Sequence, residues 1–419
     1  MTKMLSRRAF LQGSALAGAA ISADLSFAPA IAQTGAIRIG LLTIKSGPLA
    51  QAGLQVDQGL TAFLKEKAST INGRKVDIIV ADTGGTPAGA RSKAQELVER
   101  EKVDLILGPV TATEMLAISD YIRRARIPII TLGGAEDLTQ RHLNPWLIRT
   151  CPSSAQTCHP MADFSAKELG FKRMATISDD FAFGHEQVGG FLRVFEDNGG
   201  KIVRKLWPPL ITPDYTPYIA QIQNVDGVFM GFTGSNPVKF MRAYSELGVK
   251  KDIPLVGGWT TGDDALLKSL GDEALGVQTA SIYTASLPND SNKRFVAAVL
   301  KDYENLPGAY AAWAYVTLLC LEAALKTTGG DVSDKQVLID ALRGVSLQDS
   351  PCGNFHFDKY GNIVGDVFIR RIDRKDGKLV NTIVKTYPNV SQFWTYPEDQ
   401  FLAQPVYSRD FPPAKNLEN

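Results

Sequence analysis

The sequence predicts an α/β protein made of two doubly wound parallel-sheet lobes. From residue 36 onward, short runs rich in β-branched residues alternate with stretches of helical periodicity, and the alternation restarts near residue 171. Strands that alternate with helices favour a parallel sheet with right-handed crossovers. A chain of 419 residues is also long for one ordinary core, so we expect two lobes.

Periodicity and cap residues place the individual elements. Ile37–Thr43 is apolar enough for a strand buried on both faces, and residues 53–67 have helical spacing. Thr86 and Pro87 predict the N-cap and first-turn proline of a helix that runs to residue 101. The other main elements are strands at 76–81, 104–107, 127–132 and 173–178, helices at 114–125 and 184–198, and β-hairpin strands at 355–358, 367–372 and 379–387.

Charge and composition argue against a nucleic-acid partner. The chain has 45 Lys and Arg against 44 Asp and Glu, a net charge of +1, whereas nucleic-acid binders concentrate basic residues on one surface. Hydrophobic residues make up 44% and charged residues 21%, as in ordinary soluble proteins. An anionic ligand would therefore be held by local groups.

The N-terminus indicates export. The run SRRAFL at residues 6–11 resembles the twin-arginine motif, an apolar run follows at 15–21, and Ala30-Ile31-Ala32 fits a signal-peptidase site. The apolar run is shorter than the ~20 residues that span a bilayer, which argues against a membrane anchor. We interpret residues 1–32 as a twin-arginine signal peptide and expect a periplasmic protein.

Four cysteines remain after residue 32, at positions 151, 158, 320 and 352. The periplasm permits disulfides, and we favour the pairs Cys151–Cys158 and Cys320–Cys352. Four buried free thiols are the alternative. We expect no metal site, because no metal-ligand spacing of Cys or His accompanies them.

Several motifs occur in one order along the chain: SGPLAQAG at residues 46–53, DLILGPVT at 104–111, IPII and GGA at 127–135, DDFAFG at 179–184 and FDKYG at 357–361. In this order they resemble the leucine/isoleucine/valine-type periplasmic binding proteins over residues 37–387. The resemblance implies the type I periplasmic binding fold, in which a hinge of three crossings joins two lobes that close over a ligand. It assigns residues 36–152 and 284–345 to an N-terminal lobe, 153–283 and 346–395 to a C-terminal lobe, and 396–419 to a surface tail.

The resemblance also implies a ligand site. Ligands of open parallel sheets bind beyond the carboxyl ends of the strands, near helix N-termini that favour a carboxylate. By resemblance the turn at 108–113 holds that carboxylate. Ala112 stands where the family has a serine. The groups left for the carboxylate are therefore the backbone N–H of Ala112 and the hydroxyls of Thr111 and Thr113. Capping of the helix is the alternative role for those threonines. The candidate ligand residues are Leu49, Thr111, Ala112, Thr113, Gly133, Gly134, Ala135, Phe183, Phe232, Thr233, Trp259, Thr260 and Tyr283.

The loop at 257–262 departs from the family. Amino-acid binders of this type place an acidic residue there to pair with the ligand's ammonium, whereas this sequence has Trp259 and Thr260, and Asp263 and Asp264 look like helix-start residues. A buried ammonium without a carboxylate partner is costly. Aromatic side chains at Phe183, Phe232 and Trp259 suit a flat ring, although ordinary core packing is the alternative role of Phe183 and Trp259. The sequence therefore favours a small organic carboxylate, such as an aromatic acid.

The expected function is capture of this small-molecule ligand by a monomer without cofactors, for delivery to an ABC permease in the inner membrane. A branched-chain or other amino acid, or an amide, is an alternative ligand, and a membrane receptor is an alternative partner. A periplasmic enzyme has less support, because the four histidines give no metal spacing and no GxSxG or Walker motif occurs.

Overall fold

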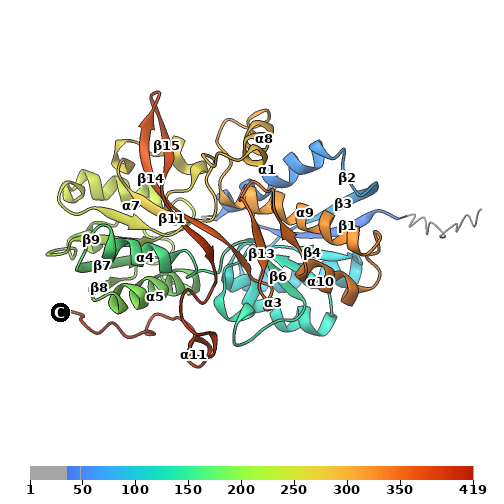
Figure 1. The fold of residues 1–419 in the computed structure, drawn as a ribbon, viewed down its shortest axis with the longest axis horizontal. Coiled ribbons are helices and arrows are strands. Elements are labelled where there is room, and N and C mark those ends of the chain that lie inside the picture. The colour runs from blue at the N-terminus through green and yellow to red at the C-terminus, as the bar shows by residue number, and fades with distance from the viewer. Residues whose placement is uncertain (1–34, 48, 419) are drawn as a thin grey trace, which may run out of the picture. The chain divides into compact units, whose positions relative to one another are not determined.

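The computed structural model describes residues 35–47 and 49–418, so the predicted signal peptide lies outside the described residues. The described residues form two lobes, each built on one sheet (Figure 1). The parallel pairings described below confirm the predicted α/β class.

The sheet of the first lobe has six strands. They are β1 (Ile37–Thr43), β2 (Thr70–Ile71), β3 (Arg74–Asp82), β4 (Leu105–Leu107), β5 (Ile129–Thr131) and β6 (Leu147–Arg149). Their order is β2-β3-β1-β4-β5-β6, and all neighbours are parallel except β2 and β3. β1 is almost entirely buried, as expected of a strand covered by helices on both faces.

The sheet of the second lobe has nine strands. They are β7 (Arg173–Ser178), β8 (Lys201–Leu206), β9 (Gly227–Gly231), β10 (Leu255–Gly257), β11 (Gln278–Ser281), β12 (Ser346–Leu347), β13 (Phe355–Phe357), β14 (Ile363–Lys375) and β15 (Lys378–Val390). β8, β7, β9, β10 and β11 are parallel neighbours in that order, and β14 adds to β11 in the antiparallel direction. β14 and β15 form a hairpin much longer than the sequence predicted.

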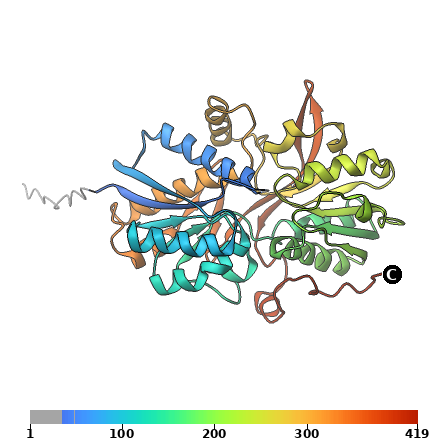
Figure 2. The ribbon, with the colours of Figure 1, turned by 180° about the vertical axis from the view of Figure 1, so that it is seen from behind.

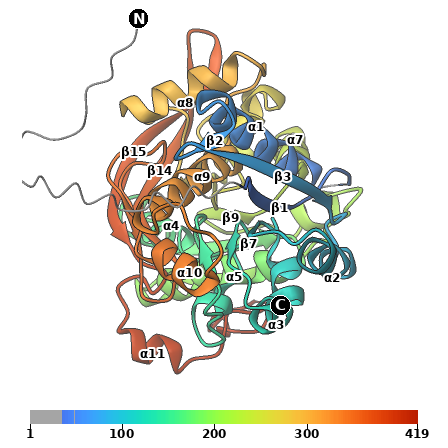
Figure 3. The same cartoon turned by 90° about the vertical axis from the view of Figure 1, so that its right-hand side faces the viewer.

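Helices cover both sheets. They are α1 (Ala50–Glu66), α2 (Pro87–Gln95), α3 (Ala112–Ala125), α4 (Cys158–Lys167), α5 (Ala182–Asp197), α6 (Thr216–Ile219), α7 (Asn236–Glu246), α8 (Asp290–Leu300), α9 (Ala309–Thr327), α10 (Lys335–Arg343) and α11 (Glu398–Leu402). In the first lobe α2 and α3 pack together (Figure 2), and α9 packs between α1 and α10 (Figure 3). α4 and α5 pack on the second sheet.

The chain passes between the lobes three times. It enters the second sheet after β6, returns after β11 to form α8, α9 and α10 against the first lobe, and then forms β12 to β15. A bridge between Arg149 and Asn362 joins the end of β6 to the residue before β14, so two of these passages lie side by side. The three crossings agree with the predicted fold, while the predicted lobe boundaries stay predictions.

The predicted cap of the second helix is confirmed. The Thr86 side chain accepts a hydrogen bond from the Gly89 N–H at 3.1 Å, and Pro87 occupies the first helical position. Pro has no N–H to lose there and its φ angle already suits the helix. A π-helical turn over Glu96–Arg100 continues α2 nearly to the predicted end.

The segment after Tyr396 is less irregular than predicted. It contains α11, and the Phe401 ring is 1% exposed. The Arg193 guanidinium of α5 lies 4.9 Å from the centre of that ring, and Arg141 of the first lobe donates hydrogen bonds to the Phe401 and Gln404 carbonyls. The aromatic residues of this Pro-rich segment are therefore packed against the folded chain. Along the described stretch of the chain, no helix combines the length and apolar character needed to cross a membrane.

We expect Phe401→Ala to lower the free energy of unfolding by about 3–5 kcal/mol, because it empties a buried aromatic site. Urea denaturation measures the change. Leu417→Ala, in the same segment but 54% exposed, is the control and should have an effect within about 0.5 kcal/mol. If both substitutions change the free energy of unfolding equally, burial of the Phe401 ring contributes no packing energy beyond that of an exposed side chain.

Candidate functional site

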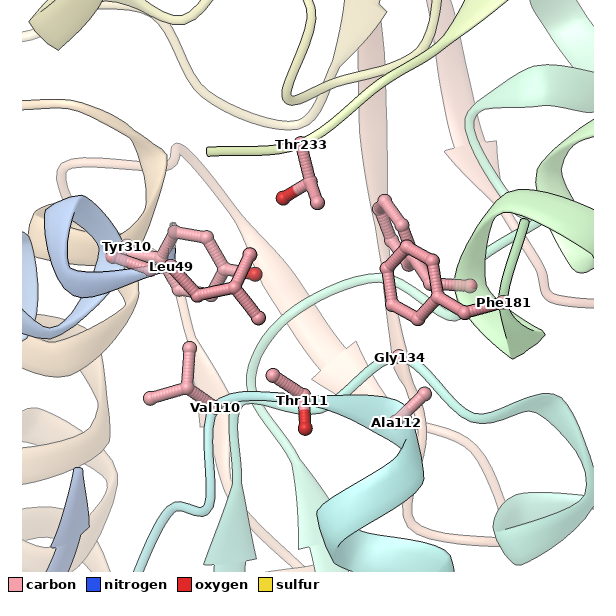
Figure 4. A pocket seen from close by; sticks show the side chains of 10 residues that line it. Leu49, Val110, Thr111, Ala112, Gly134, Phe181, Thr233 and Tyr310 are labelled. Carbon is pink, nitrogen blue, oxygen red and sulfur yellow. The ribbon is translucent and has the colours of Figure 1, made fainter. Parts of the chain in front are cut away.

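A cavity lies between the two lobes and has walls from both (Figure 4). It holds about 330 Å³ of empty space, part of it open to solvent. Its lining residues come from the N-terminal ends of helices and the loops after strands: Leu49, Ala52, Val110, Thr111, Ala112, Gly134, Phe181, Phe183, Thr233 and Tyr310.

The N-terminus of α3 forms one wall. Thr111 is its N-cap: the hydroxyl accepts from the Glu114 N–H at 3.2 Å and donates to the Glu114 carboxyl at 2.7 Å, and the Thr111 N–H donates to the same carboxyl at 3.1 Å. In Figure 4 the Thr111 hydroxyl points away from the cavity. Thr111 is therefore engaged in capping, as the alternative interpretation held.

The next two N–H groups of α3 are available to a ligand. Within residues 35–47 and 49–418, the N–H groups of Ala112 and Thr113 have no hydrogen-bond acceptor. Unpaired N–H groups and the positive end of the helix dipole favour a bound anion at this place. Burial of Glu114, whose carboxyl caps the same turn, raises its pKa, which lessens its repulsion of an anion.

The turn after β5 brings backbone close to the cavity. A Cβ atom on Gly134 would lie 2.8 Å from the Ser154 Oγ, and one on Gly133 would lie 2.7 Å from the Thr111 carbonyl oxygen. Ser154 fastens the turn, because its N–H and hydroxyl donate to the Gly134 carbonyl at 2.8 and 2.9 Å. Gly133 and Ala135 support the turn, but only Gly134 lines the cavity.

Aromatic residues form a side wall of the cavity (Figure 4). Phe181 and Phe183, at the start of α5, have ring centres 6.0 Å apart. Trp259 lies behind them, 1% exposed, with its ring 5.1 Å from Phe183, 5.4 Å from Tyr310 and 4.6 Å from Trp313. Trp259 thus supports the lining residues and is not itself on the cavity surface.

Two further aromatic candidates belong to the core. Phe232 is fully buried, with its ring 5.5 Å from Tyr215 and 5.0 Å from Phe240, while the neighbouring Thr233 lines the cavity. Tyr283 is also fully buried, and its ring packs 6.3 Å from that of Phe295. Neither lines the cavity.

A second cavity of about 300 Å³ adjoins the first, and more of its lining residues have polar side chains. Thr260 and Asp263 line it. The Asp263 carboxylate accepts from the Ala309 N–H at 2.8 Å, the Ala265 N–H at 3.1 Å and the Gln55 side chain at 3.2 Å. Asp263 therefore caps its own short helix, as predicted, and also the first turn of α9. Burial raises the pKa of this carboxyl, and the three donors oppose the rise.

Buried carboxyl groups also lie behind the Gly134 turn. The Glu136 N–H donates to the Glu186 carboxyl at 3.3 Å, and the Glu136 carboxyl accepts from the Ala155 N–H at 2.7 Å. Burial raises the pKa of both carboxyls, and Arg149 opposes the rise. A raised pKa reduces the negative charge that a bound anion would meet.

Sequence analysis missed four lining residues: Ala52, Val110, Phe181 and Tyr310. The first three lie inside motifs that the resemblance had already singled out. Tyr310 had no such signal, since it stands in the first turn of a helix far from those motifs along the chain.

The predicted disulfides are wrong. Cys151, Cys158, Cys320 and Cys352 are free and buried. Cys158 lies in α4, where its thiol donates to the Ser154 carbonyl at 3.6 Å and to the Gln187 side chain at 3.8 Å. Burial raises the pKa of Cys151 to about 12, so this thiol stays protonated. All four cysteines are therefore buried free thiols, which was the alternative prediction. The described residues also contain no cluster of three or more side chains able to hold a metal ion.

A cavity between two α/β lobes is a place where a protein of this architecture could hold a small molecule. The family model of the periplasmic binding proteins matches residues 36–378, so the chain belongs to this family, and the resemblance drawn from its motifs is confirmed.

Individual relatives are similar along most of their length. The Leu/Ile/Val-binding protein homolog 6 of Brucella suis biovar 1 (strain 1330) is 27% identical over 376 residues, which cover 87% of this chain and 95% of the relative. A solute binding protein of an ABC transporter from Rhodopseudomonas palustris BisB5, solved with 3,4-dihydroxybenzoic acid, is 32% identical with a TM-score of 0.81, over 85% of this chain and 98% of the other. Another from R. palustris, solved with benzoate, is 26% identical with a TM-score of 0.79, over the same shares.

One buried ion pair fastens the loop that carries Trp259. Arg370 and Asp264 are both fully buried, 3.3 Å apart, and Arg370 also donates to the Trp259 carbonyl at 3.3 Å and the Tyr283 carbonyl at 2.8 Å. We expect Arg370→Met to lower the free energy of unfolding by about 3–5 kcal/mol, because it leaves Asp264 buried and unpaired.

Arg371→Met is the matched control for Arg370→Met. Arg371 is the next residue on β14, but its side chain is 48% exposed and pairs with Asp373 at the surface. We expect a change below about 1 kcal/mol for this exposed pair. Urea denaturation of both variants measures the loss of free energy of unfolding. A loss of similar size in both would show that burial does not make the Arg370–Asp264 pair more important to stability than an exposed pair.

Proposed function

We propose that the protein is the substrate-binding component of an ABC importer and that it captures an aromatic carboxylate in the cavity between its lobes. One observation carries this proposal: the cavity joins a helix N-terminus that has two unpaired N–H groups to an apolar and aromatic surface, and the described residues of its lining include no acidic side chain. The N–H groups of Ala112 and Thr113 suit a carboxylate, and Phe181 and Phe183 suit a ring. The ligands solved with the two R. palustris proteins support the same choice.

An aliphatic amino acid is the second candidate, because Asp263 lines the adjoining cavity and the Brucella relative is described as a Leu/Ile/Val-binding protein homolog. The Asp263 carboxylate, however, already accepts three N–H groups. An α-ammonium also lies next to its own carboxylate, hence near α3, whereas Asp263 borders the other cavity. This geometry favours the aromatic acid.

Export and delivery complete the proposed function. The twin-arginine signal would send the protein to the periplasm, in keeping with its family. There a ligand that contacts both lobes would stabilise the closed arrangement, which would dock on a permease in the inner membrane. Release would follow reopening of the lobes.

A thermal-shift comparison tests the ligand class. A ligand that binds only the folded protein stabilises it by about 2.7 kcal/mol at one hundred times its Kd. We expect benzoate to raise the melting temperature and leucine to leave it unchanged. Stabilisation by leucine and not by benzoate would establish the amino-acid alternative instead.

Substitution at the first position of α3 tests the carboxylate site. Ala112→Pro removes the N–H that would face the carboxylate, while proline is compatible with this helical position and with the extended conformation of Thr111. We expect benzoate affinity to fall by about tenfold to a hundredfold, the value of a hydrogen bond to a charged group. Calorimetric titration measures it.

Ala112→Ser is the control for the proline substitution, because it keeps the backbone N–H. Its affinity should stay within about threefold of the original protein. If the proline variant binds benzoate as tightly as the serine variant does, the carboxylate does not lie at α3.

A further inference from the structure

The two cavities meet at three residues that line both of them: Ala52, Thr233 and Tyr310. Two of these three carry a hydroxyl group. In Figure 4 both hydroxyl oxygens point into the cavity. Thr233 was a candidate ligand residue from its position after β9, whereas Tyr310 was not predicted from the sequence.

The Tyr310 hydroxyl is held firmly in place but has no partner. Its residue is 9% exposed, and its ring packs edge-on against Trp259 and Trp313, with ring centres 5.4 and 5.3 Å away. Its backbone N–H donates to the Gln55 side chain at 3.2 Å. In the part of the chain that the structure describes, nothing hydrogen-bonds to the hydroxyl. Burial raises the pKa of Tyr310, so the group stays protonated and able to donate.

The Thr233 hydroxyl is in the same situation. Thr233 is 7% exposed, and its position is fixed by its N–H, which donates to the Asp179 carboxyl at 3.0 Å. Its hydroxyl has no hydrogen-bond partner among the described residues. Because both hydroxyls face the cavity, a ligand that displaces water from it must offer them hydrogen bonds, since an unmet hydrogen bond costs free energy when water is excluded.

The Thr233 hydroxyl lies at the end of the cavity away from α3, and the Tyr310 hydroxyl lies on the side wall between that end and α3. Figure 4 shows Thr233 on the side opposite Thr111 and Ala112, with the Tyr310 ring between them along one wall. A ligand whose carboxylate lies at α3 therefore presents its far end to Thr233 and Tyr310. Beyond them the adjoining cavity has the side chains of Gln51, Gln55 and Asp263 in its lining.

We infer that the ligand carries a hydroxyl group at the end opposite its carboxylate, and that Thr233 and Tyr310 determine specificity by binding it. The inference rests on the proposed function and narrows the substrate class to hydroxylated aromatic acids. A hydroxyl both donates and accepts, so it satisfies both side chains at once. A second carboxylate at this end would face Asp263, and an apolar end would leave both hydroxyls unpaired.

Calorimetric titration with benzoate and 4-hydroxybenzoate tests this inference on the purified protein. We expect 4-hydroxybenzoate to bind at least tenfold more tightly than benzoate, a difference of about 1.4 kcal/mol. 2-Hydroxybenzoate is the positional control, since its hydroxyl lies beside the carboxylate and should bring no gain. Equal affinity for benzoate and 4-hydroxybenzoate would overturn the inference while leaving the proposed function intact.

The substitutions Thr233→Val and Tyr310→Phe test whether these two residues cause the tighter binding of 4-hydroxybenzoate. Each substitution removes one hydroxyl and keeps nearly the same shape. We expect the ratio of 4-hydroxybenzoate affinity to benzoate affinity to fall to about threefold or less in each variant, and an unchanged melting temperature without ligand shows that each variant is folded. A ratio unchanged in both variants would overturn the assignment. Failure of the unmodified protein to bind either acid would instead refute the proposed function.

Discussion

The cavity depends on two buried guanidinium groups, whose donors must all be satisfied inside the protein. Arg149, at the end of β6, donates to the Ala135 carbonyl at 2.6 Å and to Asn362 at 2.8 Å. Arg370, on β14, donates to the Trp259 and Tyr283 carbonyls. Because a buried charge without partners is costly, each arginine holds its loop carbonyls in one place. The two arginines stand on chain segments that connect the lobes, so the loops around the cavity are fastened at the crossings themselves.

Contact between the lobes next to the cavity is polar and close. Asp263, in the loop after β10, accepts from the Ala309 N–H of α9 in the first lobe, and Gln55 of α1 donates to the same carboxylate. Gly308 makes the approach possible, since a Cβ atom there would lie 2.0 Å from an Asp263 oxygen. Such hydrogen bonds exchange readily with water and contribute modestly to stability. An interface of this kind suits the proposed cycle of closing and reopening better than a broad apolar one would.

Local patterns predicted the fold well because each element depends mainly on its own residues. The strand Ile37–Thr43 and the Thr86 cap lie where periodicity and capping chemistry placed them. The cavity was harder to predict, because its members meet only through the fold. Phe232, Trp259 and Tyr283 were candidates on residue type and loop position, yet they are buried in the core, and nothing local distinguishes a ring that faces a cavity from one that lies a layer behind it. Tyr310 reaches the site only because α9 packs against α1.

The two ends of the cavity differ in how they depend on sequence. At α3 the available groups are backbone N–H groups and the helix dipole, which persist whatever the side chain, so Ala112 in place of the family's serine leaves these N–H groups available. At the other end the groups are the side chains of Phe181, Phe183, Thr233 and Tyr310, which change with the sequence. Under the proposed function, this arrangement would keep a carboxylate as the common feature of the ligands and let a few side chains select the rest of the molecule. Identity of about a quarter to a third with proteins of the same architecture is therefore compatible with either a shared or a different ligand. Which ligand the protein binds depends on the residues that face the end of the ligand opposite its carboxylate.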